Sequence, residues 1–117
     1  MRKETSSNTL HKTKLEADCG MAYTVSVLNG RWKLSILGFL SNNKKWRYSD
    51  LKRKMPDVSE RMLIAQLKEL KSDGLIYRIA YPEVPPRVEY QLSAKGKSLK
   101  KILDAMSVWG EKNRVPR

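Results

Sequence analysis

A helix expected over residues 59–73 is the feature that most restricts how this chain can fold, because it carries two different faces. Its leucines recur three or four residues apart, which indicates one buried face, and they are Leu63, Leu67 and Leu70. Ser59 stands where an N-cap is preferred, and Gly74 stands where a left-handed residue commonly ends a helix. The sequence itself therefore defines both ends of this helix.

Two strands are expected after this helix, over residues 76–81 and 87–92, where β-branched and aromatic side chains alternate with others. Prolines lie between the strands and predict an exposed hairpin tip, since proline cannot donate to a sheet ladder. A short helix is expected earlier, over residues 50–54, with Ser49 as its N-cap. Helix, turn, helix and hairpin in this order predict an α+β, mostly helical chain with a winged helix-turn-helix fold.

Further helices are expected on either side of this region. One covers residues 20–28, and another covers residues 31–40 and should be central because it is apolar almost all round. Gly38 within that helix predicts a closely approaching backbone. Ser93 is expected to cap one long last helix, whose apolar face is wide for the end of a small monomer.

Length and charge limit the kind of protein that this can be. With 117 residues there is room for one domain, expected over residues 16–117 after a polar, mobile arm of residues 1–15. Lysine and arginine total 24 against 12 aspartates and glutamates, so the net charge is +12. This surplus favours a polyanionic partner, with nucleic acid ahead of an anionic membrane surface.

Other functional classes find little support in the residue types. No apolar run could span a bilayer and no secretion signal is visible, so the cytoplasm is the expected compartment. The single cysteine, Cys19, leaves no internal disulfide and no multi-cysteine metal site. The single histidine, His11, lies in the polar arm. We therefore expect no catalytic residues, no metal and no cofactor.

The outward face of the helix over residues 59–73 has side chains that suit the major groove of DNA. Arg61 can donate two hydrogen bonds to guanine, and Ile64 and Ala65 can touch thymine methyl groups. The alternative is an ordinary solvent-facing surface, for which an isoleucine is an odd choice. The helix start also suits a phosphate. The residues of this helix that we expect at DNA are Ser59, Glu60, Arg61, Ile64, Ala65 and Lys68.

Cations outside this helix are expected to hold the duplex. Arg87 closes the hairpin tip and Arg78 lies on the partner strand, where both suit the minor groove or phosphates. The alternative for Arg87 is an ion pair with Glu83 or Glu89. A further group is expected at the DNA backbone, although such runs are often only solvated. It comprises Lys44, Lys45, Arg47, Ser49 and Lys52.

One cysteine and six short motifs carry a family resemblance. They are Cys19 and residues 28–33 (LNGRWK), 47–51 (RYSDL), 58–63 (VSERML), 67–70 (LKEL), 73–76 (DGLI) and 81–90 (YPEVPPRVEY). Together they resemble the HxlR-type family of bacterial winged-helix transcriptional regulators. The hairpin motif is the most specific of them, and the resemblance covers about residues 19–109.

The resemblance implies a homodimer bound to a pseudo-palindromic operator in double-stranded DNA, more often as a repressor. It also implies that the first and last helices form the dimer, which agrees with the wide apolar face of the last helix. The expected interface residues are Met21, Val25, Leu99, Ile102, Leu103, Met106 and Trp109.

The resemblance also raises a role for Cys19, since some family members resemble thiol switches that respond to an oxidant or electrophile. The alternative is a small residue packed at the dimer interface. With no second cysteine in the chain, only a disulfide between subunits or an adduct is available.

A basic RNA-binding or ribosome-associated module is the alternative reading of the whole chain. Trp46 and Tyr48 could stack on unpaired bases, although packing beneath the turn is the expected role of both. Outward Ile64 and Ala65 favour duplex DNA instead. A winged helix that binds only proteins would have little use for a net charge of +12.

Overall fold

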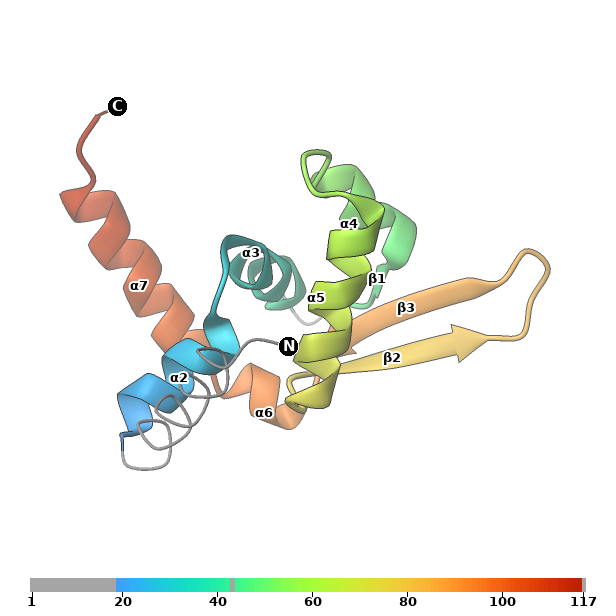
Figure 1. Cartoon of the computed structure of the whole chain (residues 1–117), viewed down its shortest axis with the longest axis horizontal. Helices are drawn as coiled ribbons and strands as arrows, with labels where there is room; N and C mark the ends of the chain where they lie inside the picture. The colour runs from blue at the N-terminus through green and yellow to red at the C-terminus, as the bar shows by residue number, and fades with distance from the viewer. Residues whose placement is uncertain (1–18, 43, 117) are drawn as a thin grey trace, which may run out of the picture. The chain divides into compact units, whose positions relative to one another are not determined.

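The computed structural model of the chain describes residues 19–42 and 44–116. The chain divides into two units after Gly30, and each unit is described by itself. The first unit contains helix α2 (Gly20–Leu28), and the second contains all elements that follow (Figure 1). The expected polar arm, residues 1–15, lies outside the described residues, and the expected domain boundary stays a prediction.

Helix α2 has the bounds that its apolar spacing predicts. Its N-cap residue is Cys19, whose carbonyl accepts a hydrogen bond from the Tyr23 amide at 3.1 Å. Met21 and Val25 are exposed on this helix, so the apolar stripe presents two large side chains to solvent.

The second unit contains five helices and three strands among its described residues. In chain order they are α3 (Arg31–Leu40), β1 (Trp46–Arg47), α4 (Tyr48–Lys54), α5 (Glu60–Ser72), β2 (Ile76–Tyr81), β3 (Arg87–Leu92), α6 (Ala94–Lys97) and α7 (Lys100–Asn113). The bounds of α3, β2 and β3 are those that the sequence predicts, and α5 lies within its predicted range.

The strands form one antiparallel sheet in the order β1-β3-β2. Strands β2 and β3 pair from Ile76 opposite Leu92 to Tyr81 opposite Arg87, and their hairpin extends away from the helices (Figure 1). This hairpin is the wing. The short strand β1 pairs with β3 and was not predicted, because two residues show no periodicity.

The core of this unit lies between α3, α5 and the sheet. Its fully buried side chains include Ile36, Leu37, Leu40, Leu63, Leu67, Leu70, Leu75 and Ile76. Burying each large apolar side chain stabilises the fold by about 1.5–3 kcal/mol, so this cluster holds α5 firmly by its leucine face. The predicted inward stripe of α5 is confirmed.

An ion pair with a buried lysine joins α3 to α5. Lys33 is only 4% exposed, and its Nζ lies 2.6 Å from Oε1 of Glu69, whose side chain is about half exposed. A buried ammonium group needs such a partner, because leaving it unpaired is expensive. No local sequence pattern indicates this pair, since the two residues lie far apart in the chain.

The end of α5 forms a Schellman motif, with Gly74 as the left-handed residue that the sequence predicts. Gly74 has φ +76°, its amide donates to the Lys71 carbonyl at 2.9 Å, and the Leu75 amide donates to the Leu70 carbonyl at 3.0 Å. Leu70 and Leu75 are both buried. The chain therefore leaves α5 in a fixed direction and enters β2.

The expectation that Ser49 caps α4 is wrong. This helix begins at Tyr48, with Arg47 as its N-cap residue and Asp50 in its first turn. Pairing of Trp46 and Arg47 with β3 fixes the chain just before the helix, so the helix starts earlier than the side-chain preference for serine suggests.

The expectation of one long last helix is also wrong. Ser93 caps only α6, where its Oγ accepts from the Gly96 amide at 3.0 Å and donates to the Gly74 carbonyl at 2.5 Å. A Cβ on Gly96 would collide with the Leu75 carbonyl oxygen, so α6 packs directly on the backbone of the residue that precedes β2. The chain then turns at Ser98 and Leu99 into α7.

The close backbone approach predicted for Gly38 is wrong as well. A Cβ at Gly38 would meet nothing within 4 Å, whereas Gly96 makes the close contact. A glycine does permit a close backbone contact in this chain, but the sequence does not show which glycine makes it.

Candidate nucleic-acid interface

Helix α5 is held by one face and presents the other. Leu63, Leu67 and Leu70 face the core, while Arg61 and Lys68 are exposed. Ile64 is 40% exposed on the same outward side. Ala65, also predicted at DNA, is half-buried, and Glu60 is exposed in the first turn of the helix. The outward face predicted from spacing is therefore available to a partner.

The start of α5 is capped as predicted. The Ser59 Oγ accepts a hydrogen bond from the Met62 amide at 3.0 Å, and the Leu63 amide donates to the Ser59 carbonyl at 2.9 Å. An N-cap of this kind stabilises a helix by about 1 kcal/mol. The Ser59 hydroxyl thus has a structural partner, and it remains exposed at the positive end of α5.

The wing places Arg87 among groups that already bind it. Its Nη2 lies 2.9 Å from Oε2 of Glu83, its Nη1 lies 3.8 Å from Oε2 of Glu89, and its guanidinium stacks 3.9 Å from the centre of the Tyr81 ring. An ion pair is the alternative to DNA contact that the sequence allows for Arg87, and the isolated chain adopts it. Contact of Arg87 with DNA stays a prediction.

Arg78, on the neighbouring strand β2, is exposed and faces Tyr90 in the register of the sheet. The basic run before and within α4 is mostly exposed as well. Lys44, Lys45, Arg47 and Ser49 are exposed, and Lys52 is half-buried. Lys44 and Lys45 precede β1, Arg47 lies on β1, and Lys52 lies on α4. Helix α4 is the element that precedes α5 in the chain.

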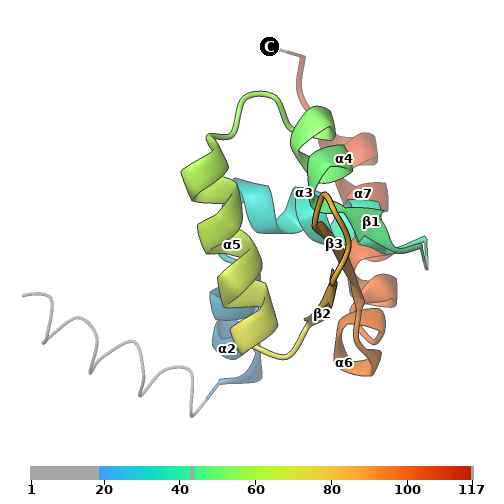
Figure 2. The ribbon, with the colours of Figure 1, turned by 90° about the vertical axis from the view of Figure 1, so that its right-hand side faces the viewer.

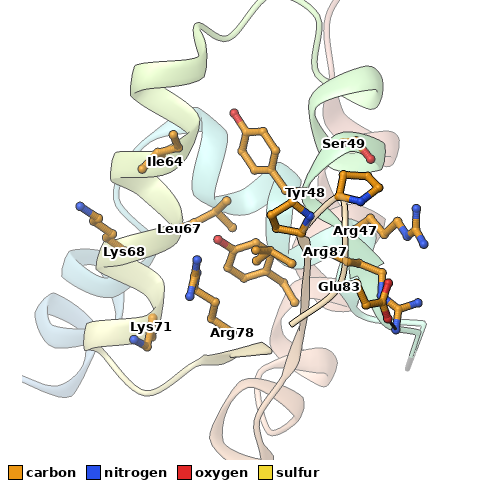
Figure 3. A pocket seen from close by; sticks show the side chains of 14 residues that line it. Arg47, Tyr48, Ser49, Ile64, Leu67, Lys68, Lys71, Arg78, Glu83 and Arg87 are labelled. Atoms are coloured by element: carbon orange, nitrogen blue, oxygen red, sulfur yellow. Dashed lines mark ion pairs between the residues drawn. The ribbon is translucent and has the colours of Figure 1, made fainter. Parts of the chain in front are cut away.

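Helix α5, the wing and the start of α4 together enclose a pocket of about 670 Å³ (Figure 3). Figure 2 shows the ribbon of α5 standing apart from the ribbons of β2 and β3. Side chains of α5 form one wall, and those of the hairpin and of residues 47–49 form the other. No local sequence pattern indicates the pocket, because its walls come from four separate segments.

Tyr48 lines this pocket, and Trp46 does not. The Trp46 ring packs on Phe39 with ring centres 5.4 Å apart, which agrees with the expected core role of Trp46. The Tyr48 hydroxyl is buried without a hydrogen-bond partner among the described residues. Burial raises the pKa of Tyr48 above its ordinary value, and the negative charge of Glu60 and the nearby Tyr90 raise it further.

Helix α7 has no buried residue, and its apolar face is bare. Ile102 and Met106 are nearly half exposed and Trp109 is 69% exposed, while Leu103 is half-buried. Leu99 is buried within its own chain, so it offers little surface to a second copy. Val108 is also exposed, and the predicted stripe did not include it.

The part of the chain that the structure describes contains one cysteine, and it offers neither a metal site nor a membrane-spanning helix. Cys19 is a free thiol of intermediate exposure. Within residues 19–42 and 44–116, no group of three or more His, Cys, Asp or Glu side chains could hold a metal ion. No described helix combines the length and the apolar character that a bilayer crossing requires.

Comparisons with known proteins agree with this arrangement. A family model described as "HxlR-like helix-turn-helix" matches residues 27–117. The HTH-type transcriptional regulator YtcD of Bacillus subtilis is 51% identical over 94 residues, which cover 79% of this chain and 74% of YtcD.

Solved structures are similar too. The redox regulator HypR in its oxidized form superposes with a TM-score of 0.76 at 38% identity, covering 84% of this chain and all of the HypR chain. Diamide-treated YodB from Bacillus subtilis gives a TM-score of 0.66 at 29% identity, covering 83% of this chain and 95% of YodB.

Proposed function

Since this chain belongs to the HxlR-like helix-turn-helix family and is a DNA-binding transcriptional regulator, we propose that α5 reads an operator and that two copies bind it together. Membership of a regulator family sets aside both the RNA-binding alternative and an enzyme. A regulator of this class works beside the chromosome, so the cytoplasm is the compartment that we propose.

The exposed face of α5 is the observation that carries the proposal. Its leucine face is fixed in the core, so the outward face keeps a constant orientation. Arg61 fits a guanine edge, and Ile64 fits the methyl group of a thymine. A half-exposed isoleucine between two cations gains little from water but gains contact area in a major groove.

Phosphate contacts would come from the elements around α5. We assign this role to the exposed cations Lys44, Lys45 and Arg47 before α4, and to Arg78 on the wing. Contact of Arg87 with DNA requires its guanidinium to leave the Glu83 carboxylate and bind a phosphate, so one anionic partner replaces another. These contacts set the strength of binding and not its sequence preference.

We propose that a second copy covers the bare apolar faces of α2 and α7. A helix of 14 residues without a single buried side chain is poorly stabilised by propensity alone, because most helical stability comes from packing. Two copies related by a two-fold axis would present two α5 helices to half-sites about 34 Å apart. A pair of regulators lying across a promoter is expected to repress it.

Selection of bound duplexes from a random pool, followed by footprinting, tests this proposal. We expect an inverted repeat and two protected half-sites about one helical turn apart. A single protected site, bound by protein that light scattering shows to be dimeric, would contradict the proposed reading by two α5 helices. Competition with structured RNA at equal charge should leave the protected sites unchanged.

A second proposal concerns Cys19, and the similarity to HypR and to diamide-treated YodB favours it. We infer that oxidation joins the Cys19 thiols of two copies. The S–S bond forms as two electrons and two protons pass to the oxidant, which for diamide reduces the N=N bond to a hydrazine. The thiol is partly exposed and sits at the start of α2, on the surface assigned to the dimer.

A non-reducing gel after diamide treatment tests the thiol proposal. The protein should run at about twice its 13.5 kDa mass and return to that mass with dithiothreitol. Cys19→Ser is the matched control and should stay at the monomer position. Oxidation should change the operator affinity of the native protein and leave that of Cys19→Ser unchanged. Unchanged operator affinity in a crosslinked native sample would contradict a regulatory role.

A further inference from the structure

The pocket between α5 and the wing has the size and lining of a small-molecule site. Its volume of about 670 Å³ falls within the range of roughly 300–1,000 Å³ typical of such sites. We propose that it binds a small organic anion with a flat apolar body, and that this ligand and operator DNA exclude each other. The second half of this statement rests on the proposed reading of DNA by α5.

The charges around the pocket select an anion. Five cationic side chains line it, and they are Arg47, Lys68, Lys71, Arg78 and Arg87. One carboxylate, Glu83, is among the lining residues, and it is already paired with Arg87 at 2.9 Å. The remaining positive charge is therefore not balanced within the pocket, and an incoming anion would be attracted to it.

The apolar part of the lining argues for a ligand with a carbon body. Leu67 and Tyr90 are buried residues that reach the pocket. Further apolar surface comes from Ile64, Pro85, Pro86 and Val88. A phosphate of the DNA backbone would use the cations and leave this surface without a partner. A flat aromatic or similar group would cover the surface and remove its apolar area from water, which favours binding.

Tyr48 supplies a donor that the protein itself does not use. Its hydroxyl is buried against the pocket without a partner among the described residues. A tyrosine hydroxyl is protonated at neutral pH, and burial raises the pKa of Tyr48 further, so this group can donate to an anion without repelling it. Figure 3 shows Tyr48 in the pocket with Ile64 and Lys68 on the facing helix.

The same side chains serve both proposed ligands, which makes binding mutually exclusive. Ile64, Lys68 and Arg78 line the pocket, and we also assign them to DNA contact. A molecule lying on Ile64 and held by Arg78 would stand where a DNA strand must pass between α5 and the wing. Such a ligand would release the regulator from its operator without any change in the dimer.

The fluorescent probe 1-anilinonaphthalene-8-sulfonate, a flat aromatic sulfonate, tests the site on the full chain. We expect saturable binding of one probe per chain with a rise in fluorescence. Tyr48→Phe should weaken binding about tenfold, because one hydrogen bond to a charged group is lost. Arg78→Gln should weaken it at least as much. Tyr77→Phe, which removes an exposed hydroxyl outside the pocket, is the matched control and should bind like the native protein.

Tyr48→Phe also separates binding from folding. The hydroxyl has no partner to lose, so the variant should unfold at the same temperature as the native protein or higher. Its operator affinity should stay unchanged, because Tyr48 is not among the residues assigned to DNA. Probe binding that ignores both Tyr48→Phe and Arg78→Gln would overturn the site.

Displacement experiments test the remaining claims. Operator duplex should displace the probe in proportion to the protein that it binds, and a probe that stays bound would overturn mutual exclusion. Inorganic phosphate should bind the pocket far more weakly than the probe does, so at equal ionic strength it should displace little of the probe. Phosphate that binds as tightly as the probe would refute the role of the apolar lining. Failure of the operator to bind at all, with the probe site intact, would refute the proposed function and leave the pocket standing.

Discussion

Arg61 is the residue on which we expect base preference to depend most, because it lies exposed on the first turns of α5. Arg61→Ala should cost about 1–3 kcal/mol on the selected operator and relax the preference for one base pair. Lys44→Ala is the matched control and should weaken all duplexes alike while reducing the salt dependence. Fluorescence anisotropy with operator and random duplexes measures both. An equal loss on the two duplexes for Arg61→Ala would contradict base reading.

Removing Glu69 should lower the free energy of unfolding more than replacing Lys33 does. Glu69→Ala leaves a buried ammonium group, and we expect a loss of about 2 kcal/mol, between the values for surface and buried pairs. Lys33→Met replaces the cation by an apolar chain of similar length and should change the free energy of unfolding by less than about 1 kcal/mol.

Urea denaturation of the two single variants and the double variant measures this coupling. In the Lys33→Met background, Glu69→Ala should have almost no effect, since no buried charge is left behind. An equal loss from Glu69→Ala in both backgrounds would show that Glu69 acts through something other than Lys33.

At the scale of the elements, α6 depends on one glycine. Gly96→Ala would drive a methyl group into the Leu75 carbonyl and the Leu92 side chain, so we expect a loss of about 1–3 kcal/mol. Gly38→Ala is the matched control, because a Cβ at this position in the last turn of α3 meets open space. It should stabilise the chain by up to about 1 kcal/mol through helix propensity.

If α6 packs as described, thermal unfolding should show a lower melting temperature for Gly96→Ala and a higher one for Gly38→Ala. A neutral Gly96→Ala would mean that β2 and α6 separate easily. A destabilising Gly38→Ala, at protein concentrations where the chain is monomeric, would show a backbone contact at α3 that the structure does not contain.

At the scale of the whole molecule, the bare face of α7 decides whether the chain works as a pair. Met106→Glu would bury a carboxylate in the proposed interface, so we expect monomers by light scattering and a loss of operator binding. Ser107→Glu is the matched control, because it adds the same charge about 100° further round the helix. A dimeric Met106→Glu protein would move the interface elsewhere.

The sequence by itself determined the parts of this protein whose causes lie within about 15 residues. Ser59, the leucine spacing and Gly74 define α5, and its outward face follows from the same spacing. Alternation and the proline-rich tip define the wing, whose strands have the predicted bounds. Caps, periodicity and turns act locally, so a single sequence contains them.

Only the tertiary structure decided which distant residues meet. It paired Lys33 with Glu69 and placed Gly96 against Leu75, so each residue acquired a role that its own neighbours in sequence do not indicate. The pocket beside α5 arises in the same way, from segments joined only by folding. Distances between such residues depend on the packing of the whole unit, and no local pattern encodes them.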